Sequence, residues 1–160
     1  MKAKKWANQA KVLVYIWLIV LVCSPAWAQD TRPNAYVGSD VCIECHEEQY
    51  EKFSKYARKS RSFQSVLKMR KGLAADEVKE CYACHTTGYG KPGGFVSLEQ
   101  TPELKNAGCE VCHGPGGRHV ETQDPTDIVK DITIDTCERC HTEERVAAFR
   151  YRPLVHGGGH

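Results

Sequence analysis

Four copies of one short pattern, Cys-x-x-Cys-His, lie within this chain of 160 residues. The copies begin at Cys42, Cys81, Cys109 and Cys137, so their first cysteines are 39, 28 and 28 residues apart. These intervals are too short for four domains that each have their own hydrophobic core. Whatever the four motifs bind, we expect one compact body to hold all of it.

The pattern is the attachment signature of c-type haem. Two thiols one helical turn apart lie on the same face, where they can add to the two vinyl groups of one porphyrin. The histidine behind them then lies under the iron as its proximal ligand. The motifs therefore predict four covalently bound haems c. We expect the thioether bonds at Cys42, Cys45, Cys81, Cys84, Cys109, Cys112, Cys137 and Cys140, and the proximal ligands at His46, His85, His113 and His141.

Other cysteine-based sites fit this pattern less well. A zinc ribbon uses paired Cys-x-x-Cys but requires no histidine directly behind every pair. A disulfide scaffold has cysteines at assorted spacings, again without the histidines. Eight of the nine cysteines of this chain lie in the four motifs, which favours haem.

The first 28 residues have the organisation of a secretory signal peptide. Four lysines accompany an apolar run over residues 12–22, which is too short for a permanent membrane span. Small residues at Ala26 and Ala28 predict cleavage after Ala28; an uncleaved anchor and lipidation of Cys23 are the alternatives. We therefore expect an exported protein, periplasmic or extracellular, with residues 29–160 as one tetrahaem cytochrome c domain and no stable membrane span after cleavage.

The charge of the mature chain argues against a nucleic-acid partner. The whole chain has 22 Lys and Arg against 20 Asp and Glu, but the four lysines of the first 28 residues would be lost on cleavage. The remaining chain then has a net charge of −2, and eight haem propionates would make the loaded protein clearly acidic.

The apolar residues come in short patches, and no long periodic helix or alternating strand dominates. The fold class that we predict is mainly α with extensive irregular loops, a polypeptide wrapped around a stack of four haems that supply most of the apolar surface. The expected helices cover residues 47–71, closed by Gly72, residues 75–84, capped near Asp76, and residues 136–149, with Asp135 as N-cap. Glycine-rich loops are expected over 86–95, where positive φ allows close approach to a flat ligand, and over 114–119.

The chain has one histidine too few to supply every axial ligand of four haem irons. Four haem irons have eight axial positions, and the chain has seven histidines, four of them proximal. The remaining three, His119, His156 and His160, are the candidates for distal ligands. Met69, a lysine, water or an open position must complete the set.

Three stretches around the motifs are more specific than the motifs alone: Val37-Gly38-Ser39-Asp40-Val41-Cys42, Cys84-His85-Thr86-Thr87-Gly88-Tyr89-Gly90 with Gly93-Gly94-Phe95, and Gly108-Cys109-Glu110-Val111-Cys112-His113-Gly114-Pro115-Gly116. With them the chain resembles the tetrahaem cytochrome c family of the c-554 type, typified by the electron acceptor of hydroxylamine oxidoreductase in ammonia-oxidising bacteria. Similar tetrahaem chains form extracellular filaments.

The resemblance implies haems in closely stacked and angled pairs and electron transfer outside the cytoplasm. His119 and His156 match positions of distal ligands in the family. The family usually has a further histidine on the helix after the first motif, where this chain has Lys59. The founding member keeps its second haem five-coordinate, which would leave the haem at Cys81 open.

Electron transfer between redox partners, such as other cytochromes or redox enzymes, is the leading functional prediction. Two alternatives stay open. One is a subunit of an extracellular cytochrome filament, a homo-polymer in which His160 ligates a neighbour's haem. The other is reduction of a small molecule, such as nitric oxide, at a haem with an open axial position.

Overall fold

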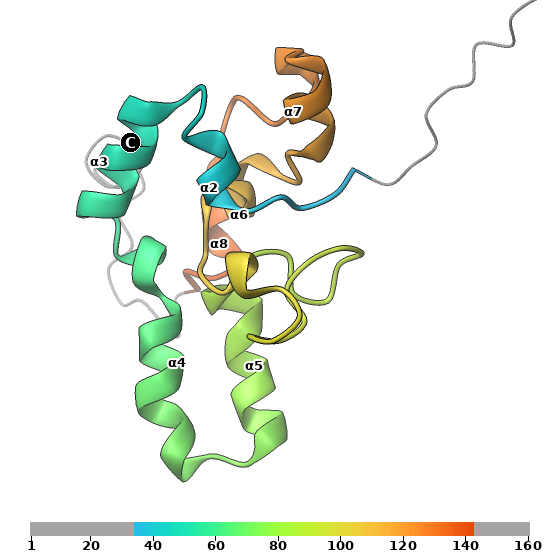
Figure 1. The fold of residues 1–160 in the computed structure, drawn as a ribbon. Coiled ribbons are helices and arrows are strands. Elements are labelled where there is room, and N and C mark those ends of the chain that lie inside the picture. The colour runs from blue at the N-terminus through green and yellow to red at the C-terminus, as the bar shows by residue number, and fades with distance from the viewer. Residues whose placement is uncertain (1–33, 143–160) are drawn as a thin grey trace, which may run out of the picture. The chain divides into compact units, whose positions relative to one another are not determined.

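The structure, a computed structural model, describes residues 34–142. Within this range the chain forms short helices joined by turns and loops, without a β-strand (Figure 1). The α-helices are α2 (Ser39–Cys42), α3 (Glu47–Tyr56), α4 (Phe63–Met69), α5 (Ala75–His85), α6 (Cys109–His113), α7 (Gly117–Thr122) and α8 (Ile134–Glu138). The 3-10 turns are η1 (Arg58–Arg61), η2 (Arg70–Gly72), η3 (Pro102–Leu104) and η4 (Pro125–Asp127).

These elements confirm a mainly helical fold with much irregular chain. The haem stack stays a prediction. The expected signal peptide, His156, His160 and the second half of the helix predicted over 136–149 lie outside the described residues. In residues 34–142 no helix has both the length and the apolar character needed to cross a bilayer.

The long helix predicted after the first motif is interrupted, so that prediction is wrong. α3 ends at Tyr56, because Ala57 has an extended backbone with φ −80° and ψ 118°. The Ser60 hydroxyl donates to the carbonyl oxygens of Ala57 (2.8 Å) and Ser54 (3.2 Å). Such local side-chain bonds offer the backbone an alternative to the helix ladder. The chain becomes α-helical again only at Phe63, and η2 ends at Gly72 as predicted.

α4 and α5 form the two arms of a helical hairpin (Figure 1). Phe63 and Val66 of α4 are buried beside Phe95 and Leu104, and these four residues make the hydrophobic core of the described chain. The Tyr82 ring of α5 lies against this core, with its centre 5.2 Å from that of Phe95. A core this small agrees with the scarcity of apolar residues in the sequence.

The caps of two helices differ from those predicted. At the start of α5 the Glu77 carboxylate accepts a hydrogen bond from the backbone N–H of Ala74 (2.7 Å), while Asp76 pairs with Lys79. α8 begins after Thr133, two residues earlier than an Asp135 cap would require, and it ends at Glu138. A preference for acidic residues in the first helical turn accounts for both misassignments, because it does not fix the cap itself.

The glycine-rich loop that follows α5 has positive φ at Gly88, Gly90 and Gly93, as predicted. Its close contacts within the protein are with Tyr36 and with the loop itself. A Cβ at Gly88 would lie 2.7 Å from the Tyr36 ring, and one at Gly94 would overlap the Gly88 carbonyl. This loop therefore needs glycine in order to fold against Tyr36 and itself.

Candidate haem sites

The second and third motifs are α-helical, whereas in the first and fourth the α-helix ends within the motif and the chain continues as a turn. The third motif is α6, and the second forms the end of α5. In the first and fourth motifs, the backbone N–H of His46 or His141 donates to the carbonyl oxygen of the first cysteine (2.9 Å in each). Positions i, i+3 and i+4 share one helix face, so both thiols and the imidazole of each motif lie on the same side.

Two proximal histidines have ring orientations that suit an iron ligand. His85 Nδ1 lies 3.0 Å from the carbonyl oxygen of Ser62, and His113 Nδ1 lies 2.7 Å from that of Val129. A carbonyl oxygen only accepts, so these bonds assign the ring proton to Nδ1 and leave the Nε2 lone pair for a metal. The residues of the motifs therefore fit a c-type haem.

The motifs come together in pairs. The Cys42 thiol of the first motif is hydrogen bonded to Cys109 of the third, which raises the pKa of Cys42 and lowers that of Cys109 to about 6. In the same way Cys140 of the fourth motif lies beside Cys84 of the second. Burial and then the bond to Cys84 raise the pKa of Cys140 to about 12. In a haem-loaded chain these sulfurs would be thioethers. The contacts then indicate only that the two motifs of each pair lie close together.

The third motif is fastened by a buried carboxylate. Glu110, with 3% of its surface exposed, accepts hydrogen bonds from the backbone N–H groups of Val37 (3.0 Å), Gly38 (2.8 Å) and Gly116 (2.8 Å). It thereby joins the segment before α2 to the loop after α6. The sequence does not indicate this role. Glu44 and Glu138 also lie between the two cysteines of their motifs, yet both are exposed.

Two serines connect different motifs. The Ser39 hydroxyl of α2 accepts a hydrogen bond from the backbone N–H of Cys109 (3.0 Å). The Ser62 hydroxyl donates to the carbonyl oxygen of His85 and accepts from the backbone N–H of Ala107, both at 2.8 Å. Ser62 thus links the second motif to the approach to the third, and nothing in its sequence context indicates this.

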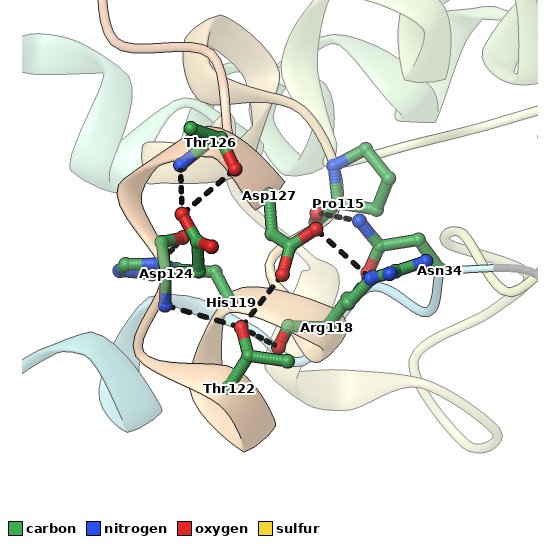
Figure 2. Close-up of polar contacts among 8 residues, drawn as sticks. All are labelled: Asn34, Pro115, Arg118, His119, Thr122, Asp124, Thr126 and Asp127. Atoms are coloured by element: carbon green, nitrogen blue, oxygen red, sulfur yellow. Dashed lines mark hydrogen bonds and ion pairs between the residues drawn. The ribbon is translucent and has the colours of Figure 1, made fainter. Parts of the chain in front are cut away.

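The sequence places His119 at the end of a loop, but it lies on α7, and a frame of polar contacts surrounds it (Figure 2). Its Nδ1 lies 2.8 Å from the carbonyl oxygen of Asp124, which leaves Nε2 for a metal, as in His85 and His113. The Asp124 carboxylate accepts from the backbone N–H of Thr126 (2.8 Å), so the turn that supplies this carbonyl is itself bonded.

The rest of the frame fixes α7. Arg118 Nε pairs with one carboxylate oxygen of Asp127 (2.9 Å), and the Thr122 hydroxyl donates to the other (2.7 Å). The Asn34 side chain accepts from the backbone N–H of Arg118 and donates to the carbonyl oxygen of Pro115 (both 2.7 Å) (Figure 2). These contacts hold α7 at both ends.

The frame brings His119 to the first motif. The rings of His119 and His46 have centres 6.2 Å apart, and their planes are inclined by only 21°. Among the histidines predicted as distal ligands, His119 is the one that lies in the described residues.

Residues 41–114 match the family model for cytochrome c554 and c-prime, a range that includes the first three motifs. Over this range the chain is similar to the cytochrome c-554 family. Cytochrome c-554 of Nitrosomonas europaea is 30% identical over 114 residues, which make up 65% of this chain and 47% of that protein. The chain thus spans about half the length of this curated relative. No solved structure matches the chain. This similarity covers the first three motifs and agrees with covalently bound c-type haem there.

Proposed function

We propose that this protein carries electrons through four c-type haems, receiving them from one redox partner and passing them to another outside the cytoplasm. The observation that carries the proposal is the pairing of the motifs, in which Cys42 contacts Cys109 and Cys84 contacts Cys140. Other cytochromes or redox enzymes are the expected partners.

The contacts between motifs support a continuous order of sites. The first motif touches the third, and the second touches the fourth. Burial first, and to a lesser degree the nearby Cys137, raise the pKa of Cys112, which agrees with the third motif lying near the fourth. The order that we propose is first, third, fourth and second. Each bound haem iron supplies a one-electron couple, and the chain's part is to hold neighbouring sites within electron-transfer distance.

His46 and His119 suit the two axial positions of the first haem. A bond between a metal ion and an imidazole nitrogen is about 2 Å long, so imidazoles on opposite sides of one metal have centres roughly 6 Å apart. The separation of 6.2 Å between these rings agrees with that arrangement. Two protein ligands favour electron transfer over the binding of small molecules at this haem.

The contacts described above do not involve the features that the two alternative functions require. A filament requires ligation by His160, and a small-molecule reductase requires an open axial position. The described residues offer no specific observation in favour of either, so electron transfer is the function that we propose.

The first test is the mass of the exported, processed protein, which should exceed that of the polypeptide by four haems. A Cys81→Ser, Cys84→Ser variant is the matched control, because it removes both thioether bonds of one motif and should lack one haem. Stopped-flow reduction of the intact protein should then show the haems exchanging electrons faster than they are reduced. No added mass, or slow exchange among the haems, would contradict the proposal.

A further inference from the structure

One stretch of the chain is uniformly basic. Residues 58–72, which contain η1, α4 and η2, include six Lys and Arg and no Asp or Glu, and we call them the cationic arm. The rest of the chain after residue 28 has 12 Lys and Arg against 20 Asp and Glu. A protein that is acidic elsewhere therefore has a local positive field along one arm of the helical hairpin (Figure 1).

Most of these charges face solvent. Five of the six cations are exposed, namely Arg58, Arg61, Lys68, Arg70 and Lys71. None of the five forms an ion pair with a carboxylate of residues 34–142. The acidic side chains in the first turn of the neighbouring α5 have other partners, because Asp76 pairs with Lys79 and Glu77 caps its own helix. The charges of the cationic arm can therefore act on a second molecule.

The outer side of α4 combines charge with exposed apolar surface. Gln64, Leu67 and Lys68 lie on one side of this helix, Lys71 continues that side into η2, and all four are exposed. The buried side chains of α4 occupy a different side, which packs in the core. Leu67 keeps 38% of its surface exposed between the two lysines. Apolar surface with a polar rim is typical of sites that bind proteins.

The cationic arm is bonded directly to the second motif. The Ser62 hydroxyl, between η1 and α4, donates to the carbonyl oxygen of His85 (2.8 Å), and the Ser62 carbonyl oxygen lies 3.0 Å from His85 Nδ1. At the other end of the hairpin, Ala75 begins α5 and Cys81 follows six residues later, about 9 Å along the helix axis. A protein docked on the arm would therefore lie close to the haem expected at the second motif.

We propose that the cationic arm is the docking surface for an acidic redox protein, which exchanges electrons with this chain at the second motif. The inference rests on the proposed function and deepens it, because it names the surface and the chemistry of the partner. Complementary charge of this kind steers association and raises its rate by about 10- to 1,000-fold, less as the salt concentration rises. One electron passes in each encounter: the donor centre is oxidised, a ferric haem iron is reduced, and no bond forms or breaks.

Two other occupants fit the cationic arm less well. The propionates of the haem expected at the second motif are two, so they leave at least three of the five exposed cations without a negative partner. A membrane entered by the bend of the hairpin would need the cations around that bend. They lie instead at both ends of the arm, with Arg58 and Arg61 before α4, which favours an extended acidic protein surface.

The experiment uses the haem-loaded protein and a plant-type ferredoxin, a small acidic iron–sulfur protein that is a strong one-electron reductant. Stopped-flow absorbance gives the second-order rate constant for reduction of the haems by reduced ferredoxin over a series of salt concentrations. In Lys68→Glu, Lys71→Glu this rate constant should fall by about tenfold or more at low salt, and its decrease with rising salt should disappear. Calorimetric titration with oxidised ferredoxin, in which no electron moves, should show a matching loss of affinity.

Lys91→Glu, Lys130→Glu is the matched control, because it makes the same change in net charge at two exposed lysines outside the cationic arm. Its rate constant with ferredoxin should stay within about twofold of the wild-type value, since charges far from the docked partner are screened. A neutral flavin semiquinone should reduce all three proteins at one rate, which shows that their haems are intact.

Equal rate constants for the two double variants with ferredoxin would overturn the proposal. So would binding to phosphatidylserine vesicles that depends on Lys68 and Lys71 while the ferredoxin reaction does not, because the cationic arm would then be a membrane-binding surface. Intact mass separates these outcomes from failure of the proposed function. Four haems with equal rate constants refute the docking surface alone, whereas a protein without haem refutes both.

Discussion

Glu110 offers the sharpest test of how the haem-binding segments are held, because one side chain satisfies three backbone donors. In Glu110→Ala the N–H groups of Val37, Gly38 and Gly116 lose their acceptor together. Leaving a buried donor without a partner costs about 1–3 kcal/mol. The bonds to Gly38 and Gly116 are buried and the one to Val37 is partly buried, so the expected loss of unfolding free energy is about 4 kcal/mol.

The assay is guanidinium unfolding of the haem-loaded protein, followed by its haem absorbance. Glu138→Ala is a close control, because Glu138 occupies the same place in the fourth motif and is exposed. It should change the free energy of unfolding by no more than about 0.5 kcal/mol. Glu110→Gln retains one oxygen acceptor but turns an NH₂ group toward backbone donors, so its loss should be intermediate. Equal midpoints for Glu110→Ala and Glu138→Ala would refute the reasoning.

Three further predictions concern the glycine loop and the frame of α7. Gly88→Ala should destabilise the protein by about 1–3 kcal/mol, because Gly88 has a φ of 71° and a new Cβ would meet the Tyr36 ring; Gly72→Ala, with open space around its Cβ, should not destabilise it in the same thermal melts. His119→Ala should convert one haem from low-spin to high-spin in ferric spectra, whereas loss of the exposed Val120 side chain on the same helix should not. Asp127→Ala removes the acceptor of both Arg118 and Thr122, so about 1–2 kcal/mol of stability should be lost. An unchanged thermal midpoint for that variant would show that α7 does not depend on Asp127.

The local fold of each motif can be predicted from the sequence, whereas the contacts that connect the motifs cannot. A Cys-x-x-Cys-His segment specifies its own helical turn, since three side chains at i, i+3 and i+4 need that geometry to meet one porphyrin. The break after α3 depends instead on the Ser60 hydroxyl and on the burial of Ala57, neither of which alters the apolar pattern of residues 47–71. Helix periodicity therefore predicts one helix where a local side-chain bond and the burial of one residue produce two.

The residues that escaped sequence reasoning share one property. Glu110, Ser39 and Ser62 each bond to a backbone group that lies more than twenty residues away in sequence. Sequence patterns relate neighbouring positions, so they cannot identify partners that are distant in the sequence. His119 was recognisable as a candidate ligand, but its approach to His46 becomes apparent only once α7 is placed by Asn34 and Asp127.

These long-range bonds explain how so small a core can support four motifs. The buried apolar cluster lies where α4, Phe95 and Leu104 meet, and α5 is the motif-bearing helix packed on it. The first and third motifs are joined mainly through Glu110 and Ser39, and Ser62 connects the second to the approach to the third. A hydrogen bond contributes only about 1 kcal/mol on balance, but its geometry is specific. The polar contacts therefore set where the motifs stand relative to one another, while covalent attachment and burial of haem would contribute most of the stability of this region.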